Sequence, residues 1–299
     1  MTKRIQTLLA VLAMYVVAFI AGAILFFLLA GDPLLRVFVA DVLMTVVIWL
    51  FGLAFRNSSV YDPYWSVVPP FLLLIAIIDA PVVSLAGVAV LIALSVWAVR
   101  LTWNWAKGWT DFKDQDWRYT MIHDKMPRLW FLSNFFGIMM FPTLIVFVQL
   151  AGAIRFVAAG GGIDVFTIAA CAIILGAAFI QYVADRQMAD FRVRHAGKKA
   201  CIEAGLWKLS RHPNYFGEVM VWWGLYLAHF GQARQIDLFI LAPLLMTAMF
   251  LFISIPMMEK KILSTRPGYA GYQKRVSVLI PFFRKKDIDG AETPVENRP

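Results

Sequence analysis

The chain has 299 residues, of which 61% are hydrophobic and only 16% are charged. A typical soluble domain has about a quarter charged residues and at most about half apolar ones. The composition therefore excludes a soluble domain and a disordered chain, and two cysteines are too few for a secreted disulfide scaffold. Together with the formal net charge of +9, it predicts a polytopic membrane protein with basic loops.

Apolar runs along the chain are long enough to cross a bilayer as helices, which takes about 20 residues. One run is short and is expected to be broken by Pro69 and Pro70. Because it ends at Asp79 and Pro81, it is expected to be a span with a tight turn into the next run. The first run has basic flanks like a signal peptide, but it is too long for a cleaved one and is expected to be retained. The expected spans are Gln6–Ala30, Leu35–Phe55, Trp65–Ala80, Val83–Ala106, Leu129–Val157, Asp164–Ala184, Tyr215–His229 and Leu238–Met258.

The distribution of basic residues predicts the orientation, because cytoplasmic loops are enriched in Lys and Arg. With the N-terminus in the cytoplasm, the 28 Lys and Arg residues all fall inside except Arg36, Arg155 and Arg234. The fold is therefore predicted to be all-α, a membrane helix bundle of about eight transmembrane helices with both termini cytoplasmic. The basic cluster at Arg284–Lys286 is typical of an inner membrane surface rather than of a nucleic-acid site.

Four segments are expected along the chain. Residues 1–58 form N-terminal transmembrane helices, and residues 59–128 form further helices with a cytoplasmic amphipathic loop. Residues 129–283 form a C-terminal membrane domain, and residues 284–299 form a polar tail. The aromatic loop at 107–128 is expected to lie on the membrane surface as a helix, either packed on the bundle or acting as a lid.

Polar residues are densest in the C-terminal half. A polar residue at membrane depth costs free energy, so each one there is a candidate functional or paired residue. If the sixth span stays helical beyond its apolar part, Asp185 and Arg192 lie on one face. Pro213 suits the first turn of a helix, in which Asn214 and Glu218 then share a face. These residues could hold a ligand, or they could be paired groups at helix ends near the membrane surface. The surrounding basic loops would favour a phosphate-bearing ligand, although positive-inside charge alone also explains them.

A second polar cluster lies at the mouth of the third span, where Tyr61, Asp62 and Tyr64 follow one another closely. Trp97 and Arg100 share a face of the fourth span. An acid and phenols opposite an Arg could donate protons. The same residues also fit an aromatic belt at the membrane surface, and both interpretations stay open. The sequence has no Gly-rich dinucleotide motif and no Cys/His spacing for a metal, so neither a soluble cofactor domain nor a metal site is expected.

At these motifs the chain resembles the steroid 5-alpha-reductase superfamily, closest to its bacterial branch of membrane proteins. The match is strongest over 181–283 and weaker over 62–130. It implies that residues 129–283 form the cofactor-binding domain and that the helices of 59–128 lie on the substrate side. The resemblance implies a seven-helix reductase core, to which the first span is an addition, and NADPH as cofactor. The resemblance rests on three motifs. They are an Asp with an Arg seven residues later, the pattern Asn-aromatic-x-Gly-Glu, and a C-terminal Tyr-x-x-Tyr-x-x-Arg segment. The residues implied to hold NADPH are Arg100, Gln181, Asp185, Arg192, Arg211, Asn214, Tyr215, Glu218, Tyr269, Tyr272 and Arg275.

The substrate side departs from this pattern, because the family's catalytic Tyr falls at Trp97, which cannot donate a proton as a phenol does. The expected acid is Tyr61 or Tyr64 in place of this Tyr, or Asp62, which takes the place of the family's carboxylate; the alternative is that the protein is not a steroid reductase in substrate terms. The resemblance implies NADPH-dependent reduction of a polarised C=C bond in a hydrophobic, steroid- or lipid-like substrate. It also implies a multi-pass protein of a bacterial inner membrane, surrounded by membrane lipids, without nucleic acid and without an obligate protein partner.

One alternative is an S-adenosylmethionine-dependent membrane methyltransferase of the isoprenylcysteine or phospholipid methyltransferase type. These enzymes share the element Arg-His-Pro-x-Tyr-x-Gly, which matches Arg211–Gly217 here. They usually carry a Glu-Glu pair in the C-terminal part, where this chain has Glu259-Lys260 and is one carboxylate short. A non-catalytic membrane protein is the remaining alternative.

Overall fold

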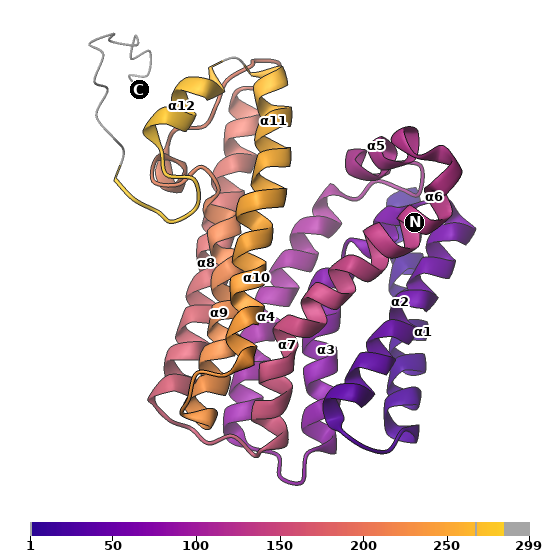
Figure 1. The fold of residues 1–299 in the computed structure, drawn as a ribbon. Coiled ribbons are helices and arrows are strands. Elements are labelled where there is room, and N and C mark those ends of the chain that lie inside the picture. The colour runs from indigo at the N-terminus through magenta and orange to yellow at the C-terminus, as the bar shows by residue number, and fades with distance from the viewer. Residues whose placement is uncertain (1, 267, 284–299) are drawn as a thin grey trace. The chain divides into compact units, whose positions relative to one another are not determined.

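The computed structural model describes residues 2–266 and 268–283, and it contains no strand among them beyond one isolated bridge between Ser210 and Ser277. Helices dominate because lipid offers no partners for backbone polar groups, so each segment must satisfy its own. The predicted all-α membrane bundle is confirmed, while Arg284–Lys286 and the polar tail lie outside the described residues. The helices are α1 (Lys3–Leu28), α2 (Pro33–Phe55), α3 (Tyr64–Asp79), α4 (Leu85–Gly108), α5 (Trp117–Lys125), α6 (Trp130–Leu132), α7 (Phe141–Ala158), α8 (Val165–Arg194), α9 (Pro213–Ala233), α10 (Leu241–Met249), α11 (Ile255–Thr265) and α12 (Tyr269–Arg275) (Figure 1).

Seven helical segments of the described chain are long and apolar enough to cross a membrane. The remaining predicted span forms as α9, which has 21 residues but is less apolar because Asn214, Glu218 and His229 lie within it. The total of eight spans therefore stays a prediction. The seven segments are Lys3–Leu28, Pro33–Phe55, Ser58–Asp79, Leu85–Gly108, Pro127–Ala158, Val165–Arg194 and Leu238–Thr265.

The chain divides into two compact units, each described here by itself. The first unit contains Met1–Ala178 and Met220–Met246, and the second contains Phe179–Val219 and Thr247–Pro299. These units follow from packing, whereas the division into four functional segments stays a prediction. In the first unit α1 packs along α2, and α3 packs against α4 and α7.

The close packing of α1 on α2 depends on a glycine. A Cβ on Gly22 would lie 2.6 Å from Cγ of Met44, so only a residue without a side chain allows this approach. Met44 itself is fully buried, as are Leu72 and Leu94 from α3 and α4. The core of the first unit is therefore assembled from the inward faces of helices whose other faces expose large apolar side chains, as lipid-facing helices do.

Three segments predicted to be cytoplasmic meet at one end of the first unit (Figure 1). Lys3 pairs with Asp111 at 2.5 Å, and Arg4 donates to the carbonyl of Ala106 at 2.8 Å. The Asn57 amide donates to the carbonyl of Phe112 at 2.9 Å, which joins the loop after α2 to the loop after α4. These contacts place the N-terminus and both loops on the same side, as the distribution of basic residues predicted.

Each arginine that was predicted to lie outside is paired with a carboxylate. Arg155 pairs with Asp32 at 2.7 Å, and Arg234 pairs with Asp164 at 2.7 Å. Arg36 makes a bidentate pair with Asp79, at 2.7 and 2.9 Å, and also donates to the carbonyl of Phe26. These exceptions to the positive-inside pattern therefore add little net charge to the far end of the unit.

Prolines inside the long helices are accommodated in two ways. Helix α3 runs without interruption through Pro69 and Pro70, so these prolines do not break the third span. Pro142 and Pro256 each follow a segment of wide π-helical turns, at Ser133–Met140 and at Phe250–Ser254. Because a proline nitrogen has no hydrogen to donate and its ring crowds the preceding turn, a wider turn relieves the conflict.

The Arg36–Asp79 pair should contribute measurably to stability. Substituting Ala for Arg36 leaves a partly buried carboxylate without its bidentate partner, and we expect a loss of about 1–3 kcal/mol in unfolding free energy. The substitution Arg234→Ala removes a more exposed pair and should cost less than about 1 kcal/mol. Thermal unfolding of the detergent-purified variants measures both, and equal losses would contradict the difference in burial.

Candidate functional site

The second unit contains the C-terminal part of α8, which remains helical to Arg194 as the ligand-binding interpretation required. Asp185 and Arg192 therefore lie seven residues apart on one face of this helix, with Asp185 half-buried and Arg192 exposed. Helix α9 begins at Pro213, so Asn214 and Glu218 share a face at its start. Both sequence predictions of a common helical face are confirmed.

The loop between these helices is anchored on α8 by a glycine in the left-handed region. Gly205 has a φ of 60°, and a Cβ there would lie 2.3 Å from the side-chain amide of Gln187. After this turn, the backbone amide of Leu206 donates to the side-chain oxygen of Gln187 at 2.9 Å. The indole N–H of Trp207 donates to the carbonyl of Ala184 at 3.0 Å. The loop that leads into α9 is therefore held at a defined position on α8.

Gln181 links α8 to the first turns of α9. Its Nε2 donates to Glu218 Oε2 at 2.7 Å and to the carbonyl of Asn214 at 3.2 Å. Gln181 and Glu218 are both buried. A buried carboxylate costs free energy unless it accepts hydrogen bonds, so the amide gives Glu218 a partner within the unit. Both residues belong to the predicted cofactor set, but no spacing in the sequence predicts their direct contact.

Glu259 of α11 is a buried carboxylate with several partners in the described part of the second unit. One oxygen accepts from His212 Nε2 at 3.0 Å and from the Tyr269 hydroxyl at 3.0 Å. The other oxygen accepts from Gln273 Nε2 at 2.6 Å, and Arg211 Nε forms an ion pair at 3.0 Å. Only 8% of Glu259 is exposed, so these partners offset the cost of burying its charge. The carboxylate ties the start of α9 to α11 and α12.

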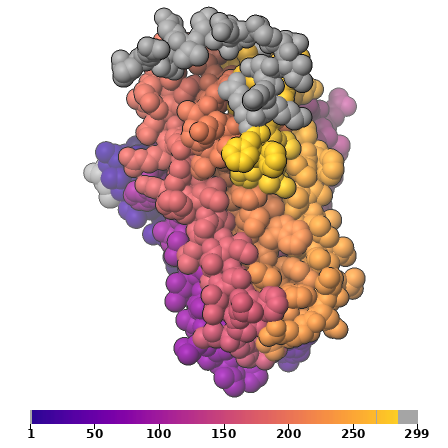
Figure 2. Space-filling model, turned by 90° about the vertical axis from the view of Figure 1, so that its left-hand side faces the viewer, coloured from indigo at the N-terminus to yellow at the C-terminus, as the bar shows by residue number. Residues whose placement is uncertain are grey.

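The C-terminal segment folds back over the loop before α9. The Tyr272 hydroxyl donates to the carbonyl of Trp207 at 2.5 Å, and Ser210 Oγ donates to the carbonyl of Leu279 at 2.7 Å. Arg275 pairs with Glu203 at 3.0 Å. Burial raises the pKa of the Tyr269 and Tyr272 hydroxyls well above their usual range, so both remain donors at neutral pH. This segment, yellow in Figure 2, lies at the surface of the unit.

The exposed charged side chains in the described part of the second unit are mainly basic, whereas most of its carboxylates are buried or paired. Glu203 and Glu259 have arginine partners, and Glu218 is buried with Gln181. An unbalanced basic surface attracts anions and suits a ligand that carries phosphate. Among the described residues of this unit, Asp190 is the exposed carboxylate, and the exposed cations are Arg186, Arg192, Arg194, Lys198, Lys199, Lys208, Lys260, Lys261 and Lys274.

The first unit contains the predicted acids, and two of them belong to one chain of hydrogen bonds. The Tyr61 hydroxyl contacts Thr143 Oγ1 at 2.6 Å, and Thr143 contacts Thr45 Oγ1 at 2.8 Å. Thr45 donates to the Tyr64 hydroxyl at 2.9 Å, and Tyr64 donates to Asp41 Oδ1 at 2.6 Å. Tyr61 and Tyr64 are only 3% and 1% exposed, so neither belongs to a lipid-facing aromatic belt.

Asp62 faces a different element from the two tyrosines. Its carboxylate accepts from the Tyr119 hydroxyl of α5 at 2.5 Å, and the neighbouring backbone amide of Asp116 donates to Ser59 Oγ at 2.9 Å. The predicted amphipathic helix is therefore α5, and it packs on the loop that contains Asp62. Tyr119 is thus a partner of the predicted acid that the sequence analysis did not name.

Trp97 and Arg100 lie on α4 in the first unit. Trp97 is fully buried and meets Trp222 edge-to-face with ring centroids 5.4 Å apart, which makes it a core residue. Arg100 is half-buried in the same helix, outside the unit that contains the other predicted cofactor residues. Its role with NADPH stays a prediction.

Several residues of these networks were not among the predicted sites. Asp41 and Thr45 could have been recognised, because they are polar residues one helical turn apart in an apolar span. Glu259 and His212 were predicted only as parts of the methyltransferase alternative, and no local spacing indicates that they meet. Nothing in the sequence around Thr143 predicts that its hydroxyl contacts Tyr61.

The family described as "Protein of unknown function (DUF1295)" matches residues 48–276, well over half of the chain. The chain belongs to this family. No curated protein and no solved structure matches it significantly. The matched segment of this DUF1295 protein includes the whole Glu259 network. It also includes part of the Tyr61–Asp41 chain.

The Glu259 network should be a main source of stability in the second unit. The substitution Glu259→Gln leaves Arg211 without its buried counter-charge, and we expect a loss of about 3 kcal/mol in unfolding free energy. Lys260→Gln is the matched control, because this neighbour is exposed and should change stability by less than about 0.5 kcal/mol. Thermal unfolding in detergent compares them, and a Glu259→Gln protein as stable as the control would exclude the proposed role of the network.

Proposed function

We propose that this DUF1295 protein is a membrane reductase of the steroid 5-alpha-reductase type. In this proposal it uses NADPH to reduce a polarised C=C bond in a hydrophobic, steroid- or lipid-like substrate within a bacterial inner membrane. The observation that carries the proposal is the grouping of its cofactor residues. Every expected cofactor position except Arg100 belongs to the second unit, although the positions come from three separate stretches of sequence.

The second unit offers groups that fit the parts of NADPH. Arg192 is exposed and can pair with a phosphate, while the half-buried Asp185 on the same face can accept from a ribose or amide group. Asn214 lies one turn before Glu218 at the start of α9, where backbone donors also face outward. Tyr269 and Tyr272 hold the C-terminal segment over this region through Glu259 and Trp207. NADPH would supply the hydride in this reaction.

The proposed proton donor is one of Asp62, Tyr61 and Tyr64. When hydride adds to the beta carbon of an enone, negative charge develops on the carbonyl oxygen, and an acid that stabilises this oxygen lowers the barrier. The hydroxyls of Tyr61 and Tyr64 share a hydrogen-bond chain that ends on Asp41, which holds both phenols in fixed positions. Asp62 is held by Tyr119 and provides the alternative acid.

Arg192→Ala and Asn214→Ala should each weaken NADPH binding about tenfold or more, since a hydrogen bond to a charged group contributes about 1.5–3 kcal/mol. Lys208→Ala, an exposed cation of the same unit outside the predicted set, should bind normally. Thermal stabilisation by NADPH measures binding, because saturation at 100 times Kd adds about 2.7 kcal/mol. Unchanged affinity in both variants would rule out this cofactor assignment.

Tyr61→Phe, Tyr64→Phe and Asp62→Asn test the acid. Removing the true proton donor should lower turnover of an enone steroid or enone lipid about 100-fold or more, with NADPH affinity unchanged. Tyr182→Phe removes an exposed phenol and is the matched control. If all three variants retain full turnover with a substrate that the parent protein reduces, none of these side chains is the acid.

A methyltransferase that uses S-adenosylmethionine is a second candidate function. The observation that favours it is the contact of Glu259 with Arg211 and His212, because these residues begin the element shared with membrane methyltransferases. The same thermal titration separates the two. Stabilisation by S-adenosylmethionine but not by NADPH would replace the reductase proposal, and the reverse result would exclude the methyltransferase.

A further inference from the structure

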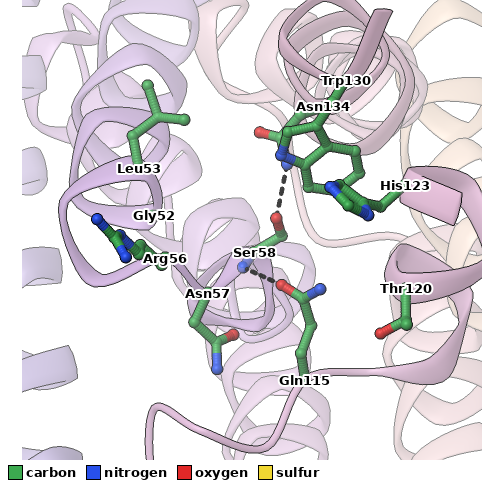
Figure 3. Close-up of a pocket in the computed structure, with 10 residues that line it drawn as sticks. All are labelled: Gly52, Leu53, Arg56, Asn57, Ser58, Gln115, Thr120, His123, Trp130 and Asn134. Atoms are coloured by element: carbon green, nitrogen blue, oxygen red, sulfur yellow. Dashed lines mark hydrogen bonds between the residues drawn. The ribbon is translucent and has the colours of Figure 1, made fainter. Parts of the chain in front are cut away.

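A hollow of about 390 Å³ lies in the first unit, at the end where the N-terminus and the cytoplasmic loops meet. This volume is in the range of small-molecule sites in proteins. Arg56 lines one side and His123 and Trp130 the other, with Ser58 and Gln115 between them (Figure 3). The complete lining is Gly52, Leu53, Arg56, Asn57, Ser58, Gln115, Thr120, His123, Trp130 and Asn134.

The floor of the hollow is held in place by its own hydrogen bonds. The backbone amide of Ser58 donates to Gln115 Oε1 at 2.9 Å, and the Asn134 amide donates to Ser58 Oγ at 2.6 Å (Figure 3). Asn57 is buried and donates to the carbonyls of Phe112 and Asp114. The hollow is therefore built from ordered segments of three different parts of the chain and is formed before any ligand arrives.

The lining favours an anion. It contains an arginine, a histidine and several neutral hydrogen-bond donors, and it contains no carboxylate. Asp116 pairs with Arg118 at 2.8 Å, and Asp124 lies 3.3 Å from Nδ1 of the lining residue His123, so the preference for an anion depends on Arg56. The carbonyls of Gly52 and Leu53 at the end of α2 accept backbone amides, which reduces their repulsion of an anion. Arg56 therefore has no competing carboxylate within the lining.

The position of the hollow decides which anion it suits. One candidate span ends at Phe55, and two others begin at Ser58 and Pro127, so the hollow lies at the depth where spans end. Large apolar side chains beside it are exposed, among them Phe55, Leu129 and Phe131. A ligand with an anionic polar head and apolar tails would satisfy both surroundings. Anionic lipids of the cytoplasmic leaflet have this character, and they are attracted to basic groups near the membrane surface.

We propose that this hollow binds the phosphate-bearing head group of an anionic membrane lipid. Arg56 pairs with the phosphate, the polar lining hydrogen-bonds the rest of the head group, and the acyl chains lie along the exposed apolar side chains of α2 and α6. This site belongs to the first unit and is separate from the residues assigned to NADPH and to proton donation.

Native mass spectrometry and thermal unfolding of delipidated protein in detergent test the proposal. The probes are phosphatidylglycerol, phosphatidylcholine with the same acyl chains, and glycerol phosphate without chains. Phosphatidylglycerol should bind and stabilise the protein, whereas the other two should do so at least about tenfold more weakly, a difference of about 1.4 kcal/mol. Equal binding of phosphatidylcholine would overturn the anion preference, and equal binding of glycerol phosphate would show that the site takes a soluble phosphate instead of a lipid.

Two variants of equal charge locate the binding. Arg56→Gln should weaken phosphatidylglycerol binding about tenfold, while Arg128→Gln, an exposed arginine at the same end that does not line the hollow, should leave it unchanged. Thr120→Val gives a second reading, because it removes a hydroxyl from the lining without changing charge and should also weaken binding. Equal losses in both arginine variants would mean that the lipid binds to surface charge in general, and the proposed site would be wrong.

Discussion

A polar group inside lipid must find its partner within the protein, because no water replaces a hydrogen bond that is lost there. This constraint accounts for the all-helical backbone of the described chain, and it also accounts for the side chains that are brought together. Arg36 with Asp79, Tyr64 with Asp41, and Glu259 with Arg211 are three solutions of the same problem. The polar networks lie where they do because an isolated polar group at the same depth would destabilise the fold.

Most of the fold could be predicted from the sequence because a membrane helix needs a long apolar run. Such a run can be recognised from the local sequence alone, without knowledge of tertiary contacts. Helix α1 and helix α4 begin and end within a few residues of their expected bounds. The last predicted span was expected to end at Met258, but the helix continues to Thr265. Glu259 explains the difference, because a charged residue that would normally end an apolar run is here satisfied by partners from other segments.

The candidate sites were predictable only where helical spacing determines them. Asp185 and Arg192 share a face because seven residues make nearly two full turns, and the same reasoning places Asn214 beside Glu218. His212 and Glu259 are 47 residues apart, and Tyr61 and Thr143 are 82 apart. No periodicity connects such pairs, so the networks that hold the candidate cofactor and acid residues follow from tertiary packing alone.

The wide turns at Ser133–Met140 and Phe250–Ser254 divide two long membrane helices into parts with different phases. A π-helical turn spreads its hydrogen bonds over one more residue than an α-helical turn, so it rotates every later side chain about the helix axis. The stripe that faces lipid before Pro142 therefore does not continue in register after it, and Pro256 has the same effect. An insertion or deletion of a single residue is tolerated best at these two places, because there a change of length alters the local turn while both flanking helices keep their contacts.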